Sequence, residues 1–258
     1  MLDYCCGLVA RTLWQLWNLF GVAFLLAWLL QLLSERIRSH GFSRFGDVYW
    51  YFVAPGVACH ESGHALGCLM TGIQIGKFVP FCRKDGLLGY VRHEAPSGWF
   101  GPIASFIIAT GPIWFGSAAI LLLTSLFADG VPELSWRANF ETSALPGLVE
   151  YGLGVMGAAV GFIFALFGGA HWGIGFIIWL YLSFCIASEI GLSVIDMKHI
   201  RPGLVRIVCV AFALNIIPSI GRGISVGIYA MMPCLFKVHV LMLAALVINL
   251  AIYAVFKR

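Results

Sequence analysis

Two histidines and a glutamate within one apolar stretch have the types and spacing of a metal site. Residues 59–65 are CHESGHA, so His60 and His64 are four apart and Glu61 directly follows the first histidine. On a helix, residues four apart lie on one face, one turn from each other, so both imidazoles can reach one ion. Zinc takes imidazole nitrogens at about 2.0–2.1 Å in a tetrahedral site. Glu61 would then reach a water beside the ion rather than the ion itself, as expected for an H-E-x-x-H motif.

A tetrahedral site with two histidines and a water needs one more protein ligand. The downstream candidates are Asp196, Glu189 and His171. The first could instead cap a helix together with Ser193, three residues before it. Glu189 could instead pair with Lys198 or Arg201, and the last candidate could be a histidine at a membrane surface.

The composition indicates that helices in a membrane position these residues. The chain has 258 residues, of which 60% are hydrophobic and 11% charged, against about 45–50% and about 25% in soluble domains. Disorder, polar repeats and an ordinary cytosolic enzyme are therefore excluded. A net charge of +4 with no block of like charges gives no reason to expect a nucleic-acid partner.

Apolar stretches of about 20 residues predict six or seven transmembrane helices. The expected spans are Thr12–Leu33, Val48–Thr71, Ile103–Phe127, two helices within Leu148–Gly191, Leu204–Ile220, and one kinked or two shorter helices within Ile224–Phe256. The predicted fold is an all-α, multi-pass membrane protein with residues 1–258 forming one transmembrane domain. Its expected catalytic core is 48–203, and 204–258 supplies additional C-terminal helices.

The H-E-x-x-H motif falls near the middle of the second predicted span. An ionisable residue at that depth costs at least ~2.5 kcal/mol and usually has a function. The alternative is a buried polar cluster that hydrogen-bonds neighbouring helices. Gly63 and Gly67, four residues apart beside the motif, predict close helix packing rather than chemistry.

A β-hairpin is expected directly after this helix. Two largely apolar runs, 73–81 and 87–94, are separated by Arg83-Lys84-Asp85-Gly86, and Asp-Gly between such runs is a hairpin signal. An edge of the hairpin could hold an extended substrate segment as an added strand. The alternative is an amphipathic loop that lies on the membrane.

In these features the chain resembles the site-2 protease family of intramembrane zinc metalloproteases, in its bacterial and archaeal branch. H-E-x-x-H within a membrane helix is followed by the hairpin, by Gly111-Pro112 near the start of the next span, and by Ser193-x-x-Asp196 after a later one. The resemblance covers roughly 48–203. The chain departs from the family pattern in four ways. Trp114 and Phe115 follow Gly-Pro where the family often has an asparagine, and Asp196 precedes Met197 instead of a glycine. A PDZ-like insertion is absent, and the distance from His64 to Asp196 is long and includes an extra apolar hairpin.

The resemblance implies a zinc-dependent intramembrane endopeptidase with one Zn²⁺ on His60, His64 and Asp196. Glu61 is then the catalytic base, and the substrate is a transmembrane protein cut in or near its membrane segment. The expected location is the lipid bilayer of the cell membrane. Two other functions use the same residues: a divalent metal transporter or sensor, and a catalytically inactive membrane scaffold of the same fold.

Overall fold

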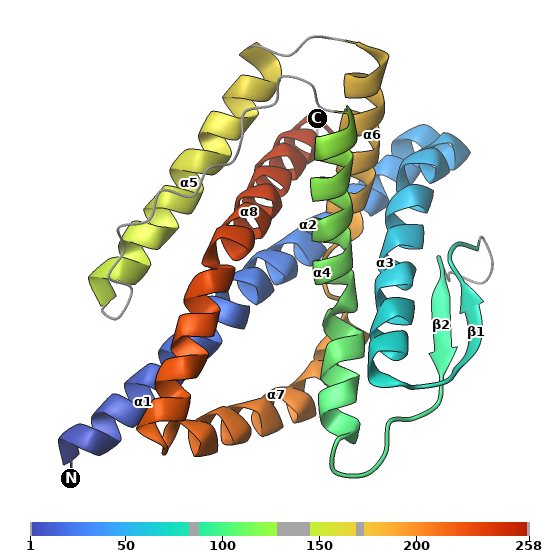
Figure 1. Ribbon diagram of the computed structural model, residues 1–258. Helices are drawn as coiled ribbons and strands as arrows, with labels where there is room; N and C mark the ends of the chain where they lie inside the picture. Colours follow the sequence, from blue (N-terminus) through green and yellow to red (C-terminus); the bar gives the residue numbers. More distant parts are fainter. Residues whose placement is uncertain (1, 83–87, 128–144, 169–172, 257–258) are drawn as a thin grey trace.

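The protein is an all-α bundle with one small sheet (Figure 1). The computed structural model describes residues 2–82, 88–127, 145–168 and 173–256. The helices are α1 (Leu2–Leu16), α2 (Val22–Phe45), α3 (Trp50–Thr71), α4 (Gly101–Phe127), α5 (Leu145–Gly168), α6 (Ile174–Glu189), α7 (Val194–Asn215) and α8 (Pro218–Phe256); the strands are β1 (Ile75–Val79) and β2 (Tyr90–His93). The all-α class and the hairpin after the histidine helix are confirmed.

Fewer of the described helical stretches are long and apolar enough to cross a membrane than the six or seven spans predicted, so that number is not confirmed. Three continuous helical stretches qualify by length and composition, Tyr4–Thr71, Gly101–Phe127 and Pro218–Ala254, and the bent pair α6–α7 adds a fourth if it forms one span. The first stretch joins three helices and reverses direction, because Gly46 at the end of α2 adopts a φ of 54°, which glycine tolerates best. Figure 1 shows α3 running back from that point.

Two predicted elements differ from the observed ones, and one alternative that was left open is decided. The first span is longer than Thr12–Leu33, because one π-helical turn (Trp17–Gly21) connects α1 to α2 without a break. Residues 224–256 lie in one helix, α8, despite Pro233 inside it. The sixth predicted span begins ten residues too late at Leu204, since α7 already starts at Val194.

A sharp break separates α6 from α7. The two helices meet at an angle of 66°, and Ser193 caps the start of α7 with an extended backbone. The two helices expected within 148–191 are present as α5 and α6. They do not pack mainly against each other: α5 lies mainly along α8, although its Phe162 ring is 6.3 Å from that of Trp179 in α6.

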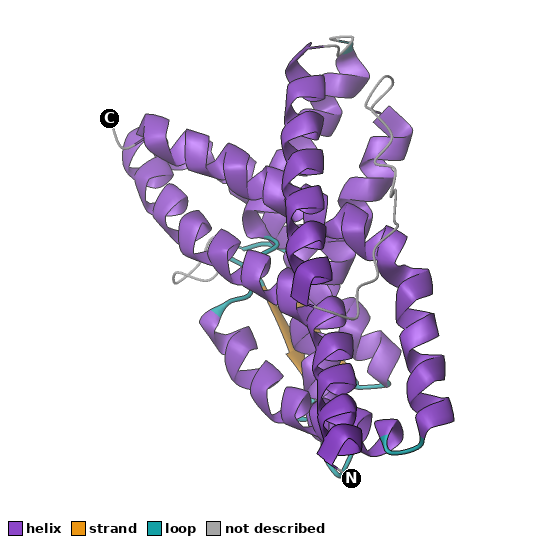
Figure 2. Ribbon diagram, turned by 90° about the vertical axis from the view of Figure 1, so that its left-hand side faces the viewer, coloured by secondary structure: helices purple, strands orange, loops and turns teal. Residues whose placement is uncertain are grey.

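The hairpin lies beside the lower half of α3 in Figure 1. Strands β1 and β2 pair antiparallel, with Val79 opposite Tyr90 and Ile75 opposite His93, and the register shifts between Ile75 and Lys77. Its expected turn at 83–86 lies outside the described residues. In Figure 2, where the molecule is turned by 90°, the sheet lies on the far side, behind the helices.

Candidate metal centre

The two histidines of α3 face each other at the centre of the bundle. The Nε2 atoms of His60 and His64 are 3.1 Å apart, and their side chains are only 14% and 13% exposed. The sequence spacing therefore acts as expected: two imidazoles one helical turn apart converge on a single point.

Main-chain carbonyls hold the other nitrogen of each ring. Nδ1 of His60 is 2.8 Å from the carbonyl oxygen of Glu189, and Nδ1 of His64 is 2.9 Å from that of Ile108. A carbonyl oxygen can only accept, so each Nδ1 carries the proton and donates it. Each neutral ring then presents the lone pair of Nε2, the atom that binds metal in this tautomer.

Neither of these two carbonyls has a hydrogen-bond partner within its own helix, and the position of each explains why. Glu189 is the last residue of α6, and the last carbonyls of a helix have no intrahelical partner. Ile108 lies four residues before Pro112, inside α4. A proline has no N–H to bond the carbonyl four residues earlier, so the Ile108 oxygen can accept from His64 instead.

Asp196 completes the group from the first turn of α7. Its Oδ1 is 3.3 Å from Nε2 of His64 and its Oδ2 is 3.7 Å from Nε2 of His60. The same residue forms a capping box: its Oδ2 accepts from the Ser193 N–H at 2.8 Å, and its own N–H donates to Ser193 Oγ at 3.1 Å. Capping and metal binding are thus compatible roles, because the cap fixes the carboxylate where it meets the two imidazoles.

These three side chains could hold a metal ion. One ligand atom from each of His60, His64 and Asp196 lies within 4.8 Å of the others. With both Nδ1 atoms held by carbonyls, the two Nε2 atoms and the carboxylate converge on one point. A positive charge between them, either a proton on one Nε2 or a metal ion, relieves their mutual repulsion, and imidazole with carboxylate is a ligand set that transition metals accept.

The second candidate ligand has a different role. The Glu189 carboxylate forms an ion pair with Arg38 of α2 at 3.5 Å and is not in the group that could hold the ion. The expected pairing of Glu189 with Lys198 or Arg201 is therefore wrong. The third candidate, His171, lies outside the described residues.

Helix α2 fixes the α6–α7 break to which Glu189 belongs. Arg38 binds the Glu189 side chain, and the Ser34 hydroxyl donates to the carbonyl of Ser188. A Cβ placed on Gly191 would lie 2.7 Å from the backbone nitrogen of Gln31, so the break lies directly against α2. Sequence analysis missed these contacts because their partners are about 150 residues apart and carry no shared motif.

Glu61 lies next to the hairpin rather than within the ligand group. A Cβ placed on Gly89, just before β2, would be 2.8 Å from Cγ of Glu61 and 2.9 Å from the carbonyl oxygen of Pro80. Only a glycine at position 89 allows the hairpin to approach this closely. The glutamate is half-buried, and it follows His60 directly in the chain, at the margin of the candidate metal site.

Close packing of α3 on α4 holds the histidine face in place. A Cβ on Gly63 would lie 2.6 Å from Cα of Pro112, and one on Gly67 would lie 2.7 Å from Cα of Ile108. The expectation that these two glycines serve packing is confirmed. The contact also brings the Ile108 carbonyl within reach of His64.

No protein-family model, no curated protein and no solved structure matches the chain. What the protein does must therefore be inferred from the chemistry of His60, His64, Asp196 and Glu61.

Proposed function

We propose that the protein is a membrane-embedded zinc metalloprotease that hydrolyses peptide bonds in or near the transmembrane segments of other proteins. The observation that carries this proposal is the convergence of the two Nε2 atoms and the Asp196 carboxylate among apolar helices, with Glu61 adjacent in the chain. The carbonyls that hold both Nδ1 atoms turn both Nε2 atoms toward the Asp196 carboxylate, which is the orientation that metal binding needs.

Zinc is the proposed ion because its catalytic sites take three protein ligands from histidine and carboxylate and keep one position open. His60, His64 and Asp196 would hold it. When bound, the ion would supply Lewis-acid polarisation of a carbonyl and activation of a water. The protonated Nδ1 atoms and the capped carboxylate keep all three ligands oriented.

Glu61 is the proposed general base. Its carboxylate would take a proton from the attacking water and return it to the leaving amine of the cut peptide bond. His60 and His64 cannot do this while their Nε2 atoms are ligands and their Nδ1 atoms donate to carbonyls. Glu61 is also the carboxylate next to the site that neither caps a helix nor belongs to the ligand group.

The hairpin is the proposed support for an unwound substrate. Peptide bonds within a helix are shielded, so a membrane helix must extend locally before it is cut. Gly89 brings the start of β2 against Glu61, and an extended segment beside this hairpin would gain main-chain hydrogen bonds.

We further propose six or seven membrane spans. The continuous α1–α2, then α3, α4, α5 and α8 would each cross once. The bent pair α6–α7 would cross as one broken span or as two. Irregular backbone at membrane depth is tolerated where protein buries it, and α2 covers the break at residues 190–193.

The deciding experiment compares the wild-type protein, Glu61→Gln and Glu94→Gln, each purified in detergent, for zinc content and for cleavage of a panel of transmembrane substrates. Glu94 is an exposed glutamate outside the helices, so it controls for the substitution itself. We expect wild type and Glu94→Gln to bind zinc and cleave, and Glu61→Gln to bind zinc but lose about 10²–10⁴-fold in rate.

Two outcomes would contradict the proposal. A protein that binds no zinc even when zinc is added would remove the metal site. Equal cleavage by Glu61→Gln and wild type would remove the assigned base. Zinc binding without cleavage by any variant, accompanied by zinc movement across reconstituted vesicles, would favour the transporter instead.

A further inference from the structure

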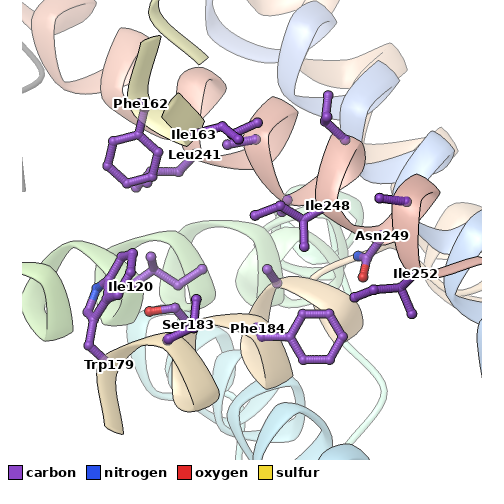
Figure 3. A pocket seen from close by; sticks show the side chains of 16 residues that line it. Ile120, Phe162, Ile163, Trp179, Ser183, Phe184, Leu241, Ile248, Asn249 and Ile252 are labelled. Carbon is purple, nitrogen blue, oxygen red and sulfur yellow. The ribbon is translucent and has the colours of Figure 1, made fainter. Parts of the chain in front are cut away.

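A second cavity lies away from the metal centre, between α5, α6 and α8 (Figure 3). Its volume is about 560 Å³, and Ile120 of α4 closes one side. Ligand-binding pockets in proteins measure about 300–1,000 Å³, so the space suits a small molecule or part of a lipid.

The cavity and the metal centre use different faces of α6. Tyr181, Cys185 and Glu189, at intervals of four, contact α3. Ser183 and Ala187 belong to the other face and line the cavity. A ligand in the cavity would therefore not compete with the proposed metal ion.

Two polar atoms on the cavity wall have no partner among the described residues. These are Oγ of Ser183 and Nδ2 of Asn249. Both residues are buried, with exposed fractions of 9% for Ser183 and 1% for Asn249. The other amide atom of Asn249, Oδ1, accepts from Ser188 Oγ at 3.1 Å. Buried polar atoms normally have partners, so a hydroxyl and an N–H here indicate that the occupant brings an acceptor. Figure 3 shows both side chains among those that line the space.

The other residues that line the cavity favour an uncharged, largely apolar ligand. None of the described residues that line the cavity is charged, and nearly all are aliphatic or aromatic. A phosphate or a carboxylate would be buried there without a counter-charge, at a high cost. Val247 on the rim is 41% exposed and Ala251 is also exposed, so the cavity opens on the outer surface of the helices, which faces acyl chains if the bundle lies in a bilayer.

We propose that this cavity binds a neutral acyl-ester lipid of the diacylglycerol type. Its acyl chain fills the apolar space between α5, α6 and α8. The oxygen of one ester carbonyl accepts from the Ser183 hydroxyl, and that of the other accepts from Nδ2 of Asn249. The proposal depends on the membrane location of the helices and not on peptidase activity.

The test uses dioleoylglycerol that carries a photoreactive diazirine in one acyl chain, added to the purified full-length protein in detergent. Cross-linked peptides are located by mass spectrometry. We expect labelling to concentrate on α6 and α8 around the cavity, and an excess of unlabelled dioleoylglycerol to suppress it. A diazirine alkane of equal length, which lacks the ester, should label the cavity about fivefold less.

Three variants separate the cavity from general lipid contact. Ser183→Ala should weaken competition by dioleoylglycerol about fivefold, and Ala244→Phe should fill the space and abolish specific labelling. Ser117→Ala is the matched control, because its Oγ is also buried without a partner among the described residues, on α4 and away from the cavity lining. If Ala244→Phe does not fold, the comparison of the two serine variants decides.

Labelling spread over all helices, equal labelling by ester and alkane, or equal effects of Ser183→Ala and Ser117→Ala would overturn the proposal. The proposal would also be overturned if a transmembrane peptide with a polar residue suppressed the labelling while unlabelled dioleoylglycerol did not. That last result would assign the cavity to a protein helix. A protein without zinc or cleavage that still shows the specific labelling would refute the proposed function and leave the lipid site standing.

Discussion

Pro112 of α4 influences the orientation of His64 in α3, because it leaves the carbonyl one turn earlier in α4 without its helical hydrogen bond. Because its nitrogen carries no hydrogen, the carbonyl of Ile108 is free to accept from Nδ1 of His64 at 2.9 Å. Partners of this kind typically change metal affinity 10–100-fold when they are removed. A proline that looks like a helix breaker therefore serves the metal centre.

Pro112→Ala should lower zinc affinity about tenfold. The alanine N–H would bond to the Ile108 carbonyl within α4 and compete with His64. The measurement is zinc affinity by competition with a chelating dye. Pro233→Ala, which changes a proline inside α8 that is exposed, is the control and should leave affinity unchanged. Equal affinity of Pro112→Ala and wild type would show that His64 does not depend on this carbonyl.

Asp196→Asn should lower zinc affinity more than the ~10–100-fold typical of an outer partner, because it removes a ligand charge. Glu189→Gln should change it much less, since Glu189 contributes its main-chain carbonyl to His60 and that group is retained. Both variants are measured in the same dye competition. If Glu189→Gln is the more damaging change, the ligand assignment moves to Glu189.

Residue types and spacing were enough to predict that His60 and His64 converge, because helical periodicity relates positions 60 and 64 directly. The preference for Asp196 as third ligand rested on the resemblance to the site-2 protease family, and the role of Glu61 stays a prediction. The acceptors for the Nδ1 atoms of the histidines could not be predicted in the same way. A carbonyl belongs to every residue, so the sequence does not mark Ile108 or Glu189 as acceptors until the packing of α3 on α4 and α6 is known.

The packing of α3 against α4 depends on the absence of side chains at two positions. Gly63 lies against Pro112, where a Cβ would be 2.6 Å from a backbone atom that cannot yield. Overpacking of this kind typically costs about 1–3 kcal/mol. The same contact sets the distance between His64 and the Ile108 carbonyl, so packing and metal binding are coupled here.

Gly63→Ala should therefore reduce thermal stability and zinc affinity together. Gly157→Ala is the matched control, because it makes the same change inside helix α5, where nothing lies within 4 Å of the added Cβ. The measurements are the unfolding temperature in detergent and the zinc affinity. Identical behaviour of the two variants would mean that α3 and α4 do not pack as closely as described.

Long apolar runs made the helices predictable, but not all of their ends. The first turns of α7 contain Asp196, Lys198 and Arg201, so hydropathy placed its start ten residues too late. The capping box at Ser193 marks the true start, and Ser-x-x-Asp had signalled it. The path of α5 along α8 could not be predicted, because apolar helices carry little information about which neighbour they contact.

The metal centre connects parts of the molecule that are distant in the sequence. The candidate ligands come from α3 and α7, and the acceptors for the histidine rings come from α4 and α6. Arg38 of α2 holds Glu189 from outside the expected core of residues 48–203. An ion at this point would bind the folded state and not the unfolded one, so it would stabilise the whole bundle.

Removing zinc with a chelator should lower the unfolding temperature of the wild-type protein. Saturation at 100-fold above Kd contributes about 2.7 kcal/mol. The unfolding temperature is measured with and without chelator, at constant pH and detergent. Asp196→Asn should show little change on chelation, because it already lacks tight zinc binding. If chelation leaves the unfolding temperature of the wild-type protein unchanged, the metal does not stabilise the fold.

The most direct test of the central claim is the zinc K-edge X-ray absorption spectrum of the purified protein. A site of His60, His64 and Asp196 predicts one zinc per chain in a first shell of nitrogen and oxygen at about 2.0–2.2 Å, with the outer-shell scattering of two imidazoles. Asp196→Asn should lose this signal or alter its first shell. A sulfur shell at about 2.3 Å would show that cysteines bind the metal instead, and it would contradict the account. The absence of bound zinc would contradict it as well.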